Sequence, residues 1–475
     1  MGQDIAQTRF SAADHAAFRA RLEAETDALR AAFAAGALSW AAPRIGCELE
    51  AWLVDRALAP APHNPAFLAR IGDPQVVAEL SRFNIELNGD PQPLAGDGLA
   101  RLEADLTRRW ARCVENAHAD IDTLLAIGTL PTLTDADLSL AAMTPSNRYR
   151  ALNRALFARR GGAPVTIDIA GPGGAHLHSV HHDVMLEAAA TSFQLHLQAP
   201  PDRIGALHDA AVMLSGPLVA LSANSPFLFG KALWHETRIA AFEQAFEPLP
   251  RAGDRQPRRV TFGSGYVGVD PVAPFVENLR DYPVLLPVPL DEPPARYPAL
   301  RLHNGTIWRW NRLLVGCDEG GDRAAPTPHL RLEQRVMPAG PSFPDMIANA
   351  AFFLGAVHAL ADAPPVLPFA VARANFRACA QRGLLARIHW DGTERPVREV
   401  LADLAARARA GLLAQQVAPD LVDRTMTVID LRLASGRNGA AWQLAHHARH
   451  GDLRRLTADY LENQRSGAPV HEWPV

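Results

Sequence analysis

Apolar and polar side chains alternate along six short stretches of the chain. In residues 45–54, for example, Cys47 and Leu49 fall on one side, and Glu48 and Glu50 fall on the other. A period of two is typical of a β-strand with one face in a core and one polar face. We predict strands over residues 45–54, 83–89, 163–174 (ending in a Gly/Pro loop), 192–198, 306–314 and 329–337.

Between these stretches the apolar positions recur with helical spacing. Residues 11–37 begin at the candidate N-cap Ser11 and are rich in Ala, Arg, Glu and Leu, which predicts a long amphipathic helix. Residues 250–300 are rich in Pro, Arg and Gly and predict a long connecting loop near a site. Further helices are predicted over 97–126, 202–221 and 233–246, and over most of the chain after Pro344.

Helices that separate non-adjacent strands predict an α+β fold with a mostly antiparallel sheet. The chain has 475 residues, 48% of them hydrophobic and 21% charged, which is the composition of a globular protein. This length suits two or three ordinary domains, or one large catalytic domain with a helical appendage. We expect a catalytic domain over residues 1–390 and a helical region over 391–475.

Charge and cysteine content narrow the classes of function. A net charge of −4 argues against a nucleic-acid-binding protein, which needs a concentrated basic surface. The four cysteines form no CxxC pair, which fits a reducing compartment and argues against a zinc ribbon or a disulfide framework. The first residues lack the layout of a signal peptide, and the longest apolar stretch is broken at Gly216-Pro217. We therefore expect a cytoplasmic protein that binds neither nucleic acid nor membrane.

The polar faces of four predicted strands share a set of side chains that suggests chemistry. One such strand alone is also typical of a solvated sheet face, but clustered acids without lysine partners repel each other. Carboxylate and amide oxygens suit a hard divalent cation, and guanidinium groups suit phosphates or carboxylates. Four such strands together favour a metal–nucleotide site, with Glu48, Glu50, Glu86, Gln194, His196, Arg331, Glu333 and Arg335 as its candidate residues.

Motifs on and beside these strands resemble a known family. The chain is similar to the glutamate–cysteine ligase type 2 family in GCELE (46–50), NIELNG (84–89), SFQLHLQ (192–198), ALSANSPFLFGK (220–231) and RLEQR (331–335) followed by VMPAGP (336–341). The resemblance covers about residues 44–360. It implies an ATP-dependent carboxylate–amine ligase related to glutamine synthetase. The implied fold is a funnel-shaped, curved antiparallel sheet flanked by helices, followed by C-terminal helices.

The resemblance also implies a metal site. The implied ligands of Mg²⁺, or of Mn²⁺ as an alternative, are Glu48, Glu50, Glu86, His196 and Glu333. Gln194 departs from the family pattern, which often has two histidines at this place, so the resemblance leaves the full ligand set open. The co-substrate implied with the metal is ATP.

Arginine and amide side chains have implied roles toward the substrates. Arg335 would face the transferred phosphate, with Arg312 as a second candidate. Contacts to substrate or nucleotide are implied for Gln194, Asn224, Arg238 and Arg331. A helix cap explains Asn224 equally well, and a surface charge explains Arg238 equally well.

The implied reaction activates a carboxylate, foremost the γ-carboxylate of glutamate, as an acyl phosphate and couples it to an amine such as cysteine. The partners would be small molecules, and a homo-oligomer is compatible with the sequence. A non-catalytic ligand sensor on the same scaffold is an alternative.

A metallohydrolase is a further alternative, because His176, His178, His181 and His182 lie close together in the sequence. No HExxH helix frames these histidines, so we predict that they lie on a loop near the cleft or at the surface. GSGYVG (263–268) is not followed by a predicted helix and indicates a glycine loop instead of a dinucleotide site.

Overall fold

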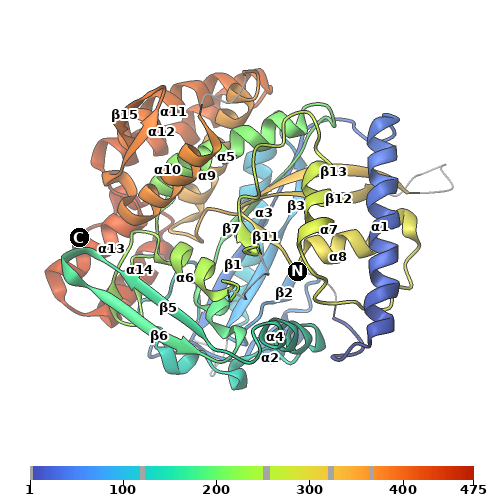
Figure 1. Cartoon of the computed structure of the whole chain (residues 1–475). Helices are drawn as coiled ribbons and strands as arrows, with labels where there is room; N and C mark the ends of the chain where they lie inside the picture. Colours follow the sequence, from blue (N-terminus) through green and yellow to red (C-terminus); the bar gives the residue numbers. More distant parts are fainter. Residues whose placement is uncertain (1–3, 118–122, 250–256, 319–325, 364–366) are drawn as a thin grey trace.

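The structure is a computed structural model that describes residues 4–117, 123–249, 257–318, 326–363 and 367–475. Its central sheet has seven strands: β1 (Arg44–Val54), β2 (Val76–Ala78), β3 (Asn84–Pro93), β4 (Thr123–Leu125), β7 (Phe193–Gln198), β12 (Asn311–Asp318) and β13 (Thr327–Gln334). Their order is β12-β13-β7-β1-β3-β2, with β4 also paired to β1. All pairings in this curved sheet are antiparallel, which confirms the predicted fold class (Figure 1).

The apolar side chains of the strands face two helices. The helix α3 (Gly98–Glu115) packs on β3, and α5 (Ile204–Ser222) packs on β12 and β13. A Cβ at Gly89 would lie only 2.7 Å from the Cys47 sulfur and 2.9 Å from Leu102, so only glycine fits between strand and helix there. Because alternate side chains point to opposite faces, the polar row of each strand points away from these helices.

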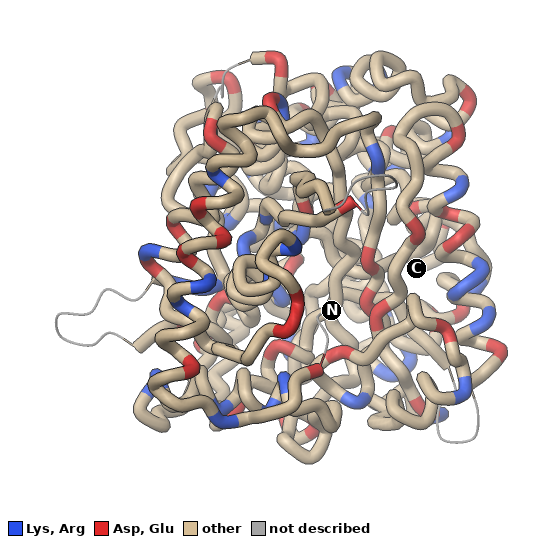
Figure 2. Tube along the Cα trace, turned by 90° about the vertical axis from the view of Figure 1, so that its right-hand side faces the viewer, with Lys and Arg blue, Asp and Glu red and all other residues tan. Residues whose placement is uncertain are grey.

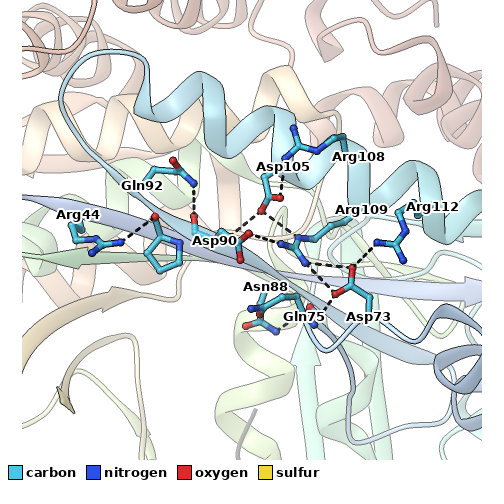
Figure 3. Close-up of polar contacts among 11 residues, drawn as sticks. Arg44, Asp73, Gln75, Asn88, Asp90, Gln92, Asp105, Arg108, Arg109 and Arg112 are labelled. Atoms are coloured by element: carbon cyan, nitrogen blue, oxygen red, sulfur yellow. Dashed lines mark hydrogen bonds and ion pairs between the residues drawn. The ribbon is translucent and has the colours of Figure 1, made fainter. Parts of the chain in front are cut away.

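A polar network connects the outer part of β3 to α3 and to the segment before β2 (Figure 3). Arg109 pairs with Asp73 at 3.3 Å, with Asp90 at 2.8 Å and with Asp105 at 3.3 Å. Asp105 also accepts a hydrogen bond from the backbone N–H of Asp90 at 3.0 Å. Since β3 carries Glu86, this network helps to fix the position of that carboxylate.

The helices α5 and α9 (Phe343–Leu360) lie side by side and are both long and apolar enough to span a membrane by length and composition. In α5, 94% of the most apolar window is buried inside the protein, and in α9 the buried share is 78%. A helix that is apolar on all sides and buried is typical of the core of a large domain. Their composition is therefore weak evidence for a membrane.

The C-terminal helices pack on α9, at the side of the sheet away from α1 (Figure 1). The backbone at Gly411 lies directly against the backbone at Gly355. A Cβ at Gly411 would lie 2.0 Å from the carbonyl oxygen of Gly355, so no larger residue fits there. A buried ion pair between Arg432 and Asp345, at 2.7 Å, adds a second link. The elements are α10 (Phe369–Arg382), β14 (Arg387–Trp390), β15 (Thr393–Pro396), α11 (Val397–Ala414), α12 (Pro419–Ser435), α13 (Gly439–His450) and α14 (Leu453–Ser466). Basic and acidic positions are interspersed over the opposite side of the molecule, which faces the viewer in Figure 2.

Two predicted boundaries were wrong. The helix predicted over 97–126 ends at Glu115, and Thr123–Leu125 form β4 because they pair with β1 in the core; residues 118–122 lie outside the described residues. The strand predicted over 306–314 is broken at Trp310. Its first part, β11 (Trp308–Arg309), pairs instead with β10 (Val260–Thr261).

The predicted loop 250–300 contains two helices, α7 (Ala273–Asp281) and α8 (Pro298–Asn304), although residues 250–256 lie outside the described residues. Each helix has a proline in its first turn, where the missing N–H costs nothing. Proline content therefore misled the prediction.

The histidine cluster lies on a strand and not on a loop, but His176, His178 and His182 are exposed, as the surface alternative predicted. His176–His181 form β6, which pairs with β5 (Val165–Ala170), and His182 follows directly. The first helix, α1 (Ala12–Ala34), begins after Ser11 as predicted and is capped by it.

The other elements of the described residues are α2 (Asn64–Ile71), α4 (Asn147–Arg159), α6 (Thr237–Ala245), β8 (Phe227–Leu228), β9 (Lys231–Ala232) and seven short 3₁₀ turns, among them η4 (Val184–Ala189).

Candidate active site

The register of the sheet brings the polar side chains of four strands together. Glu48 and Glu50 share one face of β1 because they are two residues apart. Glu50 stands directly opposite Glu86 on β3, and Glu48 stands opposite Gln194 on β7. On the other side of β7, His196 stands opposite Glu333 of β13. Directly opposed side chains in antiparallel strands are close enough to interact, so these residues form one continuous polar surface.

Two groups of side chains on this surface have the geometry of cation ligands. The first group is Glu48, His196 and Glu333, and the second is Glu50, Glu79 and Glu86. Within each group the potential ligand atoms all lie within 4.8 Å of one another. The structure thus brings together all five predicted metal ligands and adds Glu79, which the sequence analysis missed.

In the first group the negative charges are balanced by basic side chains. Arg312 holds both oxygens of Glu333, with its Nε at 2.6 Å and its Nη2 at 3.0 Å, and Arg335 lies at 3.4 Å. Burial alone would raise the pKa of Glu333, but the charges of these two arginines hold it well below its ordinary value. Glu333 is therefore ionised.

His196 connects Glu48 to Arg331. Its Nε2 lies 3.0 Å from a carboxylate oxygen of Glu48, and its Nδ1 lies 3.3 Å from Nε of Arg331. Because a guanidinium can only donate, Nδ1 is the acceptor and Nε2 carries the hydrogen that points to Glu48. Burial would raise the pKa of Glu48, but the hydrogen bond that His196 donates to it holds the pKa below its ordinary value.

In the second group, basic side chains do not balance the negative charges in this way. Burial and the charges of Glu86 and Glu50 raise the pKa of Glu79 well above its ordinary value. Burial and the charge of Glu86 raise the pKa of Glu50 to about 7. The Oε1 atom of Glu79 is buried and has no hydrogen-bond partner among the described residues. Three crowded carboxylates with an unsatisfied oxygen fit a hard divalent cation, which prefers oxygen ligands and would neutralise their repulsion.

A cavity that is partly open to solvent adjoins the second group. Phe242 and Trp310 form an apolar part of its wall, and Arg335 and Arg238 contribute positive charge. The lining residues are Glu50, Glu79, Leu80, Asn84, Glu187, Ala188, Ala190, Thr191, Ser192, Arg238, Phe242, Trp310 and Arg335. The cavity combines metal-binding carboxylates, two arginines and an aromatic wall, which is a surface for a charged organic substrate.

Gln194 and the arginines occupy distinct places around this cavity. Gln194 donates to Glu50 at 2.8 Å and accepts from Arg335, so it positions both side chains. Arg335 lines the cavity, whereas Arg312 lies behind Glu333 and outside the lining. Arg238 is only 3% exposed and pairs with Glu236 at 2.8 Å, so it is a buried residue of the cavity wall and not a surface charge.

Asn224 lies away from the cavity lining. Its side-chain amide donates to the carbonyl of Ala339 at 2.7 Å and to the hydroxyl of Tyr460 at 2.8 Å, and it accepts from Gln443 at 2.8 Å. Asn224 is completely buried, and these partners belong to the loop after β13 and to the C-terminal helices. Its place is that of a structural link between the sheet and the C-terminal helices.

Two acidic residues near the cavity had no detectable pattern in the sequence. Glu79 follows the short strand β2, and Glu187 lies in the 3₁₀ turn η4. Neither belongs to an alternating row, so only the tertiary fold brings them to the site.

The histidine cluster and the GSGYVG loop form no second metal or phosphate site among the described residues. Within these residues, His176, His178, His181 and His182 belong to no group of converging metal ligands. In the GSGYVG loop the N–H groups of Val267 and Gly268 donate to the carboxylate of Asp209, at 2.7 and 2.8 Å. Those N–H groups are therefore occupied by a side chain, and the loop is not a phosphate cradle.

Comparisons with known proteins agree with this geometry. The sequence profile of Glutamate-cysteine ligase family 2 (GCS2) matches residues 44–459, which extends the resemblance well into the C-terminal helices. No curated protein sequence matches the chain significantly.

Two solved structures are similar in fold. The glutamate–cysteine ligase of Francisella tularensis, in complex with AMP, is 13% identical with a TM-score of 0.59, over 92% of this chain and 91% of that chain. A bifunctional glutathione synthetase of Pasteurella multocida is 11% identical with a TM-score of 0.52, over 95% of this chain and 55% of that chain. With the family match over most of its length, the chain belongs to the glutamate–cysteine ligase family 2, a family of carboxylate–amine ligases.

Proposed function

We propose that this protein is an ATP- and Mg²⁺-dependent ligase that activates the γ-carboxylate of glutamate as an acyl phosphate and couples it to an amine such as cysteine. The observation that carries the proposal is the pair of adjoining cation-ligand groups on the polar face of the sheet, next to Arg335 and a cavity that opens to solvent. ATP and both amino acids are small molecules, and the reaction fits the cytoplasm, where free cysteines such as Cys47 stay reduced.

The two ligand groups are the proposed metal sites. Glu48, His196 and Glu333 would hold one Mg²⁺, and Glu50, Glu79 and Glu86 would hold another; Mn²⁺ suits the same donors. Bound at such sites, the metal supplies charge neutralisation for phosphate oxygens during phosphoryl transfer.

Arg335 is the proposed clamp for the transferred phosphate. Its guanidinium lines the cavity and is held in place by Gln194 and by Glu333, which lies 3.4 Å away. A planar fork that is fixed before the substrate arrives can stabilise the charge that develops on the phosphoryl oxygens. Arg312 acts through Glu333, so we assign it a positioning role.

Arg238 and Arg331 are the proposed contacts to the remaining charges of the substrates. Arg238 lines the cavity while Glu236 and the carbonyl of Val336 fix its orientation. Arg331 reaches His196 at the edge of the first ligand group. Neither residue has to transfer a proton, because a guanidinium stays charged.

A covalent enzyme intermediate is unnecessary in this scheme. No cysteine lines the cavity among the described residues, and burial raises the pKa of Cys47 and Cys379 far above its ordinary value. The acyl phosphate itself is the electrophile, so the protein needs to bind, orient and exclude water.

The direct test is ADP release from ATP and Mg²⁺ with glutamate and a panel of primary amines that includes cysteine. Amine-dependent ADP release, together with a new amide product, supports the ligase. ATP binding without any ADP release across the panel would contradict it and would favour a ligand sensor. Hydrolytic activity without ATP would also contradict it.

A further inference from the structure

Glu187 is a carboxylate of the cavity wall that belongs to neither cation-ligand group. It lies in η4, between β6 and β7, and lines the cavity together with Glu50, Glu79 and Arg335. Among the described residues, no hydrogen bond or ion pair reaches its carboxylate; only its backbone carbonyl is engaged, where it accepts from the N–H of Ala190. A half-buried carboxylate without a partner on the wall of a cavity is available to a ligand, and such ionisable groups cluster at functional sites.

The fold of η4 does not depend on the side chain of Glu187. Asp183 caps this turn by accepting from the N–H of Met185 at 3.0 Å. Asn153 of α4 accepts from the N–H of Val184 at 3.0 Å, and Met185 and Leu186 are buried. The turn is thus anchored by its neighbours, and the carboxylate of Glu187 is free to serve the cavity.

Charges of both signs surround Glu187. The groups that act on it are Glu50 of β1, which is negative, and Arg335 and Arg148, which are positive. Tyr149 of α4 and the buried Glu79 complete the surroundings. Burial, followed by the charge of Glu50, raises the pKa of Glu187 to about 8, although both arginines oppose this shift. A cation that binds beside this carboxyl lowers its pKa again, so a bound ammonium group favours the ionised form, which is the form that can accept its proton.

We propose that Glu187 binds the ammonium group of the amine co-substrate and accepts its proton when the amide bond forms. The proposal rests on the proposed ligase function. It restricts the acceptor to primary amines that are positively charged in solution. The neighbouring Phe242 and Trp310 leave room for an apolar or sulfur-containing body on that amine.

Atoms and charge are conserved in this step. The ammonium gives one proton to the Glu187 carboxylate, and the resulting amine nitrogen attacks the acyl carbon. The new C–N bond forms as the bond between the acyl carbon and the phosphate oxygen breaks, and phosphate takes that electron pair. The second proton lost by the nitrogen leaves with the phosphate, which yields the amide. An ammonium cannot attack before it loses a proton, so Glu187 would act on this half-reaction alone.

Hydroxylamine separates the two half-reactions. It is uncharged at neutral pH and traps an acyl phosphate as a hydroxamate without prior loss of a proton. We would measure glutamyl hydroxamate with hydroxylamine, and amide product with cysteine and the same amine panel, for the wild-type protein and for Glu187→Gln. The same measurements on Glu187→Asp test whether the negative charge restores coupling. Glu462→Gln, an exposed carboxylate of α14, is the matched control.

We expect Glu187→Gln to keep hydroxamate formation within about twofold and to lose amine coupling by about 100-fold or more, with partial recovery in Glu187→Asp. Equal loss of both products would overturn the proposal, because Glu187 would then act in activation or folding. Unchanged coupling would overturn it as well. Wild-type protein that forms hydroxamate but accepts no charged amine would contradict the role of Glu187 alone. Wild-type protein that forms neither product would contradict the ligase function itself.

Discussion

Glu50 and Glu86 stand directly opposite each other on the neighbouring strands β1 and β3, and Glu86 is only 2% exposed. Two carboxylates in this relationship repel each other unless a cation or a proton lies between them. Glu79 adds a third carboxylate to the same place. Removing a charge from this surface should therefore change both its binding of cations and the stability of the protein.

Glu79→Gln should weaken the stabilisation of the protein by Mg²⁺. In the wild-type protein a cation bound to the three carboxylates stabilises the folded state and raises the thermal midpoint. The variant loses one ligand and one repulsive charge, so its midpoint without Mg²⁺ should be equal or higher, and its rise with Mg²⁺ should be smaller. Differential scanning calorimetry with a Mg²⁺ titration measures both effects. Glu115→Gln, at the exposed end of α3, is the control, and an identical Mg²⁺ response in Glu79→Gln and in the wild type would contradict the site.

Arg335→Lys should reduce ADP release by about 100-fold or more while the protein stays folded, because a point charge cannot replace the planar fork that contacts Gln194 and Glu333. Steady-state kinetics with ATP, glutamate and an accepted amine gives the effect. Circular dichroism shows whether the fold is kept. Wild-type-like turnover in a folded Arg335→Lys protein would remove Arg335 from the phosphate site.

Glu333→Gln should abolish ATP turnover and also destabilise the protein. The change removes a metal ligand and leaves Arg312 and Arg335 without their shared carboxylate. Loss of these charged hydrogen bonds should lower the free energy of unfolding by about 2 kcal/mol. Denaturant unfolding measures this loss. Normal ADP release by the variant would contradict the role of Glu333.

Much of this surface follows from local sequence. The period of two in residues 45–54 and 329–337 is a property of the strand itself, so it assigned Glu48, Glu50 and Glu333 to one polar row before any fold was known. The register between strands is set by the whole sheet, and it alone places Glu50 opposite Glu86.

The site residues that the sequence did not reveal share a physical cause. Glu79 and Glu187 reach the site from irregular segments, where no periodic pattern marks the direction of a side chain. Asn224 lies in a motif that resembles the family, but its partners Tyr460 and Gln443 are 236 and 219 residues away in the sequence. Its structural use could be recognised only in three dimensions.

Asn224→Ala should therefore destabilise the protein without changing the binding of substrates. The buried amide makes three side-chain and backbone hydrogen bonds that water cannot replace. We expect a loss of about 2 kcal/mol in the free energy of unfolding and an unchanged KM for ATP and glutamate. Denaturant unfolding and steady-state kinetics measure the two quantities. A raised KM with unchanged stability would return Asn224 to the binding site.

Glu187→Gln should change the stability of the protein in a pH-dependent way. Burial and the charge of Glu50 raise the pKa of Glu187 to about 8, so the folded protein binds this proton more tightly than the unfolded chain does. The cost in stability is therefore complete above about pH 8, declines as the pH falls from that value toward the ordinary pKa of 4.5, and is absent below it. The variant should have a clearly higher thermal midpoint than the wild type at about pH 9 and a much smaller difference at about pH 5. An equal shift at both values would contradict the raised pKa.

The central claim is that a carboxylate becomes an acyl phosphate at this surface. The most direct measurement uses glutamate whose γ-carboxylate carries a heavy oxygen isotope, together with ATP, Mg²⁺ and an accepted amine. Mass spectrometry of the released phosphate then follows the label. An acyl phosphate predicts that one labelled oxygen passes from the carboxylate to the phosphate in each turnover. Amide formation that leaves the phosphate unlabelled would contradict the account.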